Sequence, residues 1–115
     1  MVDFRVADSR EETWGEDPRF PGVALQLLIS KIHTPAASMI RVKVSPGAVI
    51  DTHTHETETE LVYVQAGSAV LVMAGEEFPI AAGMCVAVPP GIAHSLRNTG
   101  AETVDLIAVH SPPTR

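Results

Sequence analysis

The sequence predicts an all-β protein folded as a single sandwich or barrel. Short runs of aliphatic and β-branched residues recur every eight to twelve residues, and turn signals separate them. Nine prolines and eight glycines supply those turns, and no segment keeps an apolar period of 3.6 residues over a helical length. A chain of 115 residues fits one domain of ordinary size. We therefore expect one β-domain, without an internal repeat or a second domain.

The chain divides into three parts, which are an N-terminal arm at residues 1–22, a β-domain at residues 23–111 and a tail at residues 112–115. The arm is polar and rich in turn residues. It fits a loose segment, a short helix around Ser9–Thr13 or an edge strand on a partner subunit. Trp14 and Phe20 are its large apolar groups, and we expect them to pack on another surface because aromatic side chains carry much of the burial in cores and interfaces.

Eight segments of the β-domain have strand character, and they are residues 23–30, 38–44, 61–65, 68–73, 78–80, 84–88, 93–98 and 103–110. The segment 38–44, SMIRVKV, alternates most clearly between apolar and polar positions, as a strand with one buried face does. Residues 74–77, AGEE, are expected to form the loop of a hairpin between two of these strands.

The composition excludes several classes of function. A formal charge of −6 argues against nucleic acid as a partner, because binding to its phosphates is favoured by clustered Lys and Arg. No apolar run approaches the roughly 20 residues that span a bilayer. The first residues lack the apolar core of a secretory signal, so we expect a cytoplasmic protein. Cys85 is the single cysteine, which excludes an intramolecular disulfide, and its apolar neighbours predict a small buried side chain.

Three histidines and a glutamate form a candidate metal site. One residue separates His53 from His55, so on a strand both side chains leave the same face and Thr54 points away. Glu60 follows within a strand-like run, and His94 follows a proline-rich turn. If the hairpin and the turn bring these groups together, their nitrogen and oxygen donors suit Zn, Fe, Mn, Ni or Cu. Taken singly, each group also fits an exposed polar surface.

Two complete motifs reinforce this interpretation. The first holds Gly47, His53, His55, Glu60 and Gly67, with spacers of five, one, four and six residues. The second holds Gly83, Pro89, Gly91, His94 and Asn98, with spacers of five, one, two and three residues. Both spacings match the two motifs of the cupin superfamily, and the short interval between them is typical of small single-domain bacterial cupins. The chain therefore resembles a monocupin over nearly half its length.

The resemblance implies a double-stranded β-helix, a jelly-roll barrel of two antiparallel sheets. It also implies one divalent transition metal ion per chain, either Fe, Mn, Zn, Ni or Cu, inside the barrel. The implied ligands are His53, His55, Glu60 and His94. Since a shift of two residues preserves the strand face, Glu58 is the alternative carboxylate, and Glu56 is expected to face solvent.

The surroundings of the site can be sketched from strand alternation. Val62, Val64 and Leu96 share faces with the ligands and predict an aliphatic cavity wall, whereas Tyr63 should lie in the outer layer. His110, near the end of the chain, is expected at the surface.

Arg41 and Lys43 share one face of their strand, and the sequence does not decide where that face lies. They form either a charged stripe on a solvent face, the commoner location for these residue types, or cavity groups that bind a substrate carboxylate or phosphate.

The first functional hypothesis is a metal-dependent enzyme, dioxygenase-like or an isomerase or decarboxylase, that acts on a small organic substrate. The alternative is a non-catalytic cupin module that binds a small ligand or a metal, and a purely structural role without metal is the third. Exposed sheet edges need covering, and similar cupins are commonly dimers, so we expect a homodimer. The arm at residues 1–22 suits exchange between subunits, and its alternative is a disordered terminus.

Overall fold

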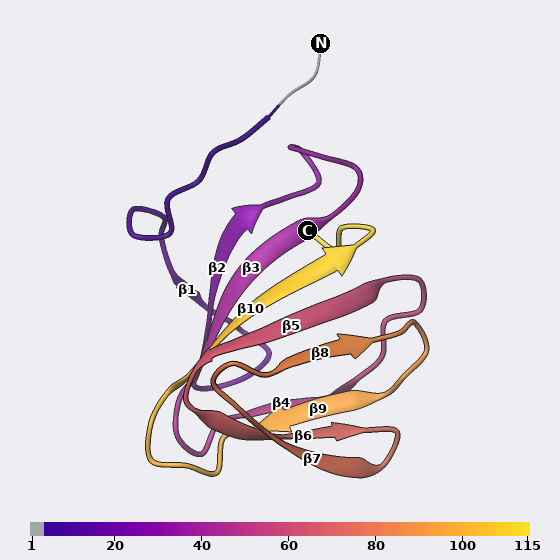
Figure 1. The fold of residues 1–115 in the computed structure, drawn as a ribbon. Coiled ribbons are helices and arrows are strands. Elements are labelled where there is room, and N and C mark those ends of the chain that lie inside the picture. The colour runs from indigo at the N-terminus through magenta and orange to yellow at the C-terminus, as the bar shows by residue number, and fades with distance from the viewer. Residues whose placement is uncertain (1–3) are drawn as a thin grey trace.

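The protein consists of two antiparallel β-sheets, seen in a computed structural model that describes residues 4–115 (Figure 1). The six-stranded sheet contains, in spatial order, β1 (Gly15–Glu16), β2 (Val23–Ile29), β3 (Ser38–Val44), β10 (Val104–Ser111), β5 (Thr59–Ala66) and β8 (Cys85–Val88). The four-stranded sheet contains β4 (Val49–His53), β9 (His94–Arg97), β6 (Ser68–Met73) and β7 (Glu76–Ala81). The described residues include no helix, and hence none able to cross a membrane. The all-β prediction is confirmed.

The core fills the space between the inner faces of the two sheets. Val44, Val64 and Val104 are fully buried in it, on the neighbouring strands β3, β5 and β10. Leu71 and Leu96 close it from the four-stranded sheet. These residues alternate with exposed or half-exposed neighbours because successive side chains of a strand leave opposite faces. The period-two pattern in the sequence is therefore the physical cause of the sandwich.

The limits of eight strands agree with the sequence prediction to within a few residues, but β1 and β4 were not among the predicted strand segments. β3 and β6 begin and end at the predicted positions. The predicted four-residue loop at residues 74–77 is wrong, because the turn contains only Ala74 and Gly75, with φ of 50° and 81°, while Met73 already pairs with Glu76. A two-residue turn with both residues in the left-handed region matches the twist of the flanking strands, so the hairpin is tighter than the composition indicated.

The N-terminal arm covers the outer face of β2 and β3. Its strand β1 pairs with β2 of the same chain, and a hydrogen-bonded turn at Asp8–Glu12 replaces the short helix that the sequence allowed. The fully buried Gln26 donates its amide hydrogens to the carbonyls of Ser9 and Glu12, at 2.7 and 2.9 Å. Trp14 lies against Arg41 and Lys43 of β3, and Phe20 packs against the core, so the predicted packing of these two aromatic residues is confirmed within this chain.

The arm also decides the location of Arg41 and Lys43. The Arg41 guanidinium lies 5.2 Å from the centre of the Trp14 ring and the Lys43 ammonium lies 4.4 Å from it, both as cation–π contacts. Arg41 also pairs with Asp105 at 2.5 Å. Both side chains are therefore on the outer face of the sheet, partly covered, and neither lines the cavity described below.

Cys85 is exposed, and the prediction of a buried thiol is wrong. Its strand β8 is an edge strand whose residues alternate, so Val86 and Val88 face inward while Cys85 faces outward. Cys85 pairs in register with Tyr63, which is 46% exposed in the outer layer as expected. An apolar run on an edge strand does not guarantee burial on both faces.

Candidate metal centre

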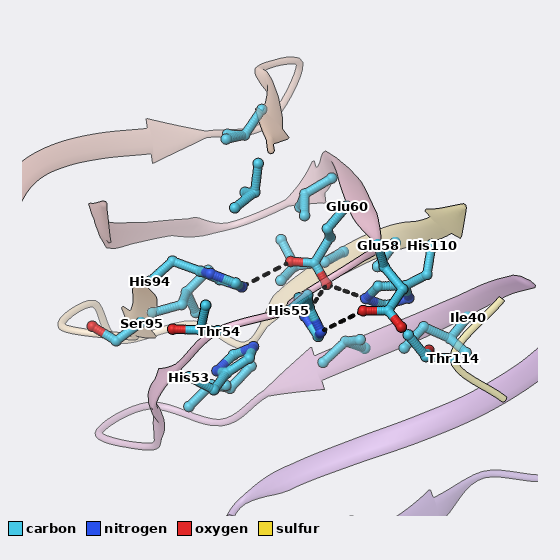
Figure 2. Close-up of a pocket in the computed structure, with 18 of the residues that line it drawn as sticks. Ile40, His53, Thr54, His55, Glu58, Glu60, His94, Ser95, His110 and Thr114 are labelled. Atoms are coloured by element: carbon cyan, nitrogen blue, oxygen red, sulfur yellow. Dashed lines mark hydrogen bonds and ion pairs between the residues drawn. The ribbon is translucent and has the colours of Figure 1, made fainter. Parts of the chain in front are cut away.

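Two pairs of facing residues, one in each sheet, build the candidate site (Figure 2). In the four-stranded sheet His53, the last residue of β4, lies opposite His94, the first residue of β9. In the six-stranded sheet Glu60 on β5 lies opposite His110 on β10. His55 follows β4 in the loop that leads to β5. The register of two strand pairs and one short loop thus brings five polar side chains together.

The three histidines of the predicted set converge. The centres of the His53 and His94 rings are 4.2 Å apart, and the His55 ring centre lies 5.1 and 5.3 Å from them, respectively. One ring nitrogen from each of the three lies within 4.8 Å of the other two. The Glu60 carboxylate adjoins this group, with Oε1 3.4 Å from His94 Nε2 and Oε2 3.8 Å from His55 Nε2. The structure therefore brings all four predicted ligands to one place.

The hydrogen bonds of the rings leave nitrogen lone pairs free for an ion. Nδ1 of His53 is 2.8 Å from the carbonyl oxygen of Asp51, and Nδ1 of His94 is 2.9 Å from that of Ile92. A carbonyl only accepts, so Nδ1 carries the hydrogen in both rings and Nε2 carries the lone pair. This is the arrangement that orients metal-binding histidines in proteins.

Three buried ring nitrogens at the site lack any hydrogen-bond partner, namely Nε2 of His55, Nε2 of His94 and Nδ1 of His110, and the two Nε2 atoms are those nearest the Glu60 carboxylate. Buried polar atoms without a partner are rare, because a buried atom that forms no hydrogen bond costs free energy. An ion among the two Nε2 atoms and the Glu60 carboxylate would satisfy these two nitrogens. The residues present therefore fit a divalent transition metal ion.

The electrostatics of the site suit a cation. Burial lowers the pKa of His53 and of His55, which favours the neutral, ligand-competent ring. Burial alone would raise the pKa of Glu60, but the hydrogen bond from His110 and the adjacent His94 hold it well below its usual range. Burial likewise opposes the charged form of His94, and the Glu60 carboxylate more than offsets this by raising its pKa. An ionised carboxylate thus lies beside two imidazoles, His53 and His55, whose neutral form is favoured by burial.

Residues 40–110 match the family model described as the cupin domain. The chain is a cupin. It is 35% identical over 89 residues to an oxalate-binding protein of Thermotoga maritima, covering 76% of this chain and 74% of that one. It is 32% identical over 110 residues to the polyketide synthase CurC of Streptomyces cyaneus, covering 94% and 70%.

The cupin fold is also found in a solved structure, that of a predicted oxalate decarboxylase from Thermotoga maritima. The two chains superpose with a TM-score of 0.85 at 32% sequence identity, covering 94% of this chain and 99% of the other. The predictions of a small single-domain cupin and of a jelly-roll barrel are confirmed.

Among the acidic residues of this cupin's first motif, Glu60 has the geometry of a ligand. Its carboxylate contacts three histidines, and its side chain is 13% exposed. Glu58 reaches only His55, at 4.0 Å, and it also bonds the hydroxyl of Thr57. Glu56 is exposed, as expected, at the rim of the cavity. The contacts favour Glu60 over Glu58.

His110 is the residue of the candidate site that the sequence interpretation missed. The prediction of a surface position is wrong, because His110 is 3% exposed and its Nε2 bonds the Glu60 carboxylate. It continues the inward face of β10 after Val104, Leu106 and Ala108, all of which are buried. Strand alternation, continued to the end of this segment, would have placed His110 on the inward face.

The strand that carries His53 ends there, so His55 and Thr54 lie in a loop. The expected alternation of Thr54 away from the site is therefore wrong, and Thr54 lines the cavity. That cavity has a volume of about 720 Å³, and its walls combine an aliphatic part, which includes Val62 and Leu96 as predicted, with a polar part around the histidines and glutamates. Val64 does not line it, because this residue packs fully buried in the core.

Replacement of Glu60 by alanine should abolish the metal site, whereas replacement of Glu58 should not. We expect the Glu60→Ala variant to bind Mn²⁺ or Zn²⁺ at least about 100-fold more weakly than the wild type, beyond the effect typical of an outer-shell partner. Elemental analysis and metal titration would measure this, with Glu58→Ala as the matched control. Full metal occupancy in the Glu60 variant would show that the assignment is wrong.

Replacement of His110 should weaken metal binding through Glu60. Without the hydrogen bond from His110 Nε2, the carboxylate loses the partner that orients it, so His110→Leu should lower metal affinity about 10- to 100-fold. His110→Gln keeps an N–H donor and should restore most of that affinity. Equal affinities of the leucine variant and the wild type would rule out an orienting role.

Proposed function

We propose that this cupin is a metal-dependent enzyme that holds one divalent transition ion through His53, His55, Glu60 and His94. The observation that carries the proposal is the pair of buried, unpartnered Nε2 atoms of His55 and His94 beside an ionised Glu60. A protein without a bound ion there would leave both nitrogens unsatisfied in the native state.

The chain's own residues would prepare the reaction. The carbonyls of Asp51 and Ile92 fix the rings of His53 and His94, and His110 fixes Glu60. The aliphatic walls limit water around a bound substrate, which strengthens electrostatic interactions. A divalent ion, when bound, supplies Lewis acidity and, if it is redox-active, electrons for oxidation. Dioxygenase-like oxidation, isomerisation and decarboxylation are the reaction classes that this arrangement suits.

The cavity favours a small organic substrate with an apolar portion. A volume of about 720 Å³ falls within the range of sites for whole small molecules and exceeds the needs of oxalate alone. The aliphatic walls favour a carbon skeleton, and a polar head would lie at the histidine end. The names of the relatives, an oxalate-binding protein and a polyketide synthase, support oxygen-rich carbon compounds as the class to test.

The alternative is a non-catalytic module that binds a small ligand or a metal. The name of the Thermotoga maritima relative, an oxalate-binding protein, favours this function because it describes binding alone. The two proposals share the site and differ only in turnover.

Elemental analysis of protein purified without added metal should find one transition ion per chain. The Fe, Mn, Zn, Ni and Cu forms should then be assayed against 2-oxo acids, phenols and oxalate, with dioxygen uptake and carbon dioxide release as readouts. Turnover by at least one form, lost in Glu60→Ala, supports the enzyme. Binding without turnover in every form would establish the module instead, and absence of both would exclude the two proposals.

We also propose that the protein is a homodimer joined through the outer face of the six-stranded sheet. Beyond the part that the arm covers, this face exposes Leu61 and Tyr63 on β5 and Met39 on β3, at 49%, 46% and 37%. Val109 and Ile107 of the intervening β10 lie in register beside them. Contiguous apolar surface of this kind is typical of interfaces, and a second copy offers a matching apolar patch.

Light scattering of the wild type should give the mass of two 12.2 kDa chains. A charge at the centre of the apolar face should be excluded from an interface, so Leu61→Asp combined with Tyr63→Asp should give the mass of one chain. Phe78→Asp, at an exposed apolar position of the four-stranded sheet, is the control and should remain dimeric. A monomeric wild type, or a dimer unaffected by the double substitution, would contradict the proposed interface.

A further inference from the structure

The C-terminal tail forms one wall of the cavity. After β10 the chain turns back, and the backbone N–H of Lys31 donates to the carbonyl of Arg115 at 2.6 Å. The N–H of Thr114 donates to the Ser38 hydroxyl at 3.3 Å. These bonds hold the tail against the segments that flank β2 and β3, and Pro113, Thr114 and Arg115 all line the cavity. Figure 2 shows Thr114 on the side of the site where Glu58 and His110 lie.

Arg115 differs from every other arginine of the chain. Within residues 4–115 the other five arginines each pair with a carboxylate, and these pairs are Arg5–Glu12, Arg10–Asp8, Arg19–Asp17, Arg41–Asp105 and Arg97–Glu77. The side chain of Arg115 has no such partner among the described residues, and it forms no hydrogen bond there. It is also half-buried, so solvent replaces the missing partner only in part.

The environment of Arg115 disfavours its charge. Burial and the neighbouring charge of Arg19 lower the pKa of Arg115, although the carboxylates of Asp17 and Glu60 act in the opposite sense. The second cavity arginine, Arg19, is already held by both oxygens of Asp17. A guanidinium remains protonated in proteins, so loss of a proton does not relieve its unpaired charge. Only a nearby anion can compensate that charge. An anionic ligand in the cavity would meet that need.

We propose that Arg115 determines ligand specificity by binding the carboxylate of a small organic acid in this cavity. The inference rests on the proposed function, since it assumes that a small molecule occupies the metal-side cavity. A planar guanidinium matches a carboxylate through two parallel hydrogen bonds. The acidic side chains of Glu56 and Glu58 also line the cavity and repel a doubly charged phosphate more than a carboxylate. The apolar part of the acid would lie against the aliphatic walls.

The test compares an acid with its neutral amide. Calorimetric titration of the Mn²⁺-loaded protein with 2-oxobutanoate and with 2-oxobutanamide would be carried out on the wild type, Arg115→Gln, Arg115→Lys and the exposed control Arg97→Gln. Arg115→Gln should bind the acid about tenfold to 100-fold more weakly and the amide unchanged, because only the acid forms the charge-assisted pair. The affinity of Arg115→Lys for the acid should lie between those of the wild type and Arg115→Gln, since lysine keeps the positive charge but cannot form the two parallel hydrogen bonds.

Metal content and melting temperature, measured on each variant, separate this role from loss of the site or of the fold. A shift of the Arg115 Nε–H signal in ¹⁵N spectra of metal-free protein on addition of the acid would report the contact independently. Equal binding of the acid by the wild type and Arg115→Gln would overturn the role of Arg115 alone. A loaded wild type that binds neither compound would count against the proposed function, and the role of Arg115 would fall with it.

Discussion

The site depends on the register of two antiparallel strand pairs, His53 opposite His94 and Glu60 opposite His110. A slip of one residue in either pair would turn its side chains to the opposite face and dissolve the cluster. The buried Asn98 helps fix this register, because its amide donates to the carbonyls of Val44 and Glu102, at 2.9 and 2.7 Å. The end of β9 is thereby tied to the end of β3 in the other sheet, so the core and the cluster are aligned by the same contacts.

Because Glu60 is largely buried, the groups aligned beside it determine whether its carboxylate stays ionised. A carboxylate out of water needs partners to remain ionised, and His110 and His94 provide them from opposite sheets. His53 and His55 are kept neutral by burial, so the positive charge near Glu60 is incomplete without a further cation. The same low-polarity surroundings that make an unpaired carboxylate costly therefore make the position selective for a metal ion.

Strand alternation predicted most of the fold, because period two is a local property of the backbone. It located β3 and β6 and the buried row of Ile40, Val42 and Val44, whereas the candidate ligands came from the spacing of the two motifs. Alternation gives the face of a side chain, but not whether another segment covers that face. For this reason alternation does not decide the environment of Arg41, which depends on the N-terminal arm that lies over its side chain. For His110, alternation along β10 indicates the inward face, but the contact with Glu60, fifty residues away in sequence, depends on strand pairing.

The candidate ion site and the candidate ligand-binding arginines lie in different parts of the chain. All five polar residues of the cluster lie within residues 40–110, the part that matches the cupin model. The arginines that line the cavity, Arg19 and Arg115, lie outside it, in the arm and in the tail. In this chain the barrel thus carries the candidate ion site, while the arm and the tail set the charge at the remaining wall. In this chain one of those two charges is neutralised by Asp17, which leaves Arg115 as the group that distinguishes an acid from a neutral compound.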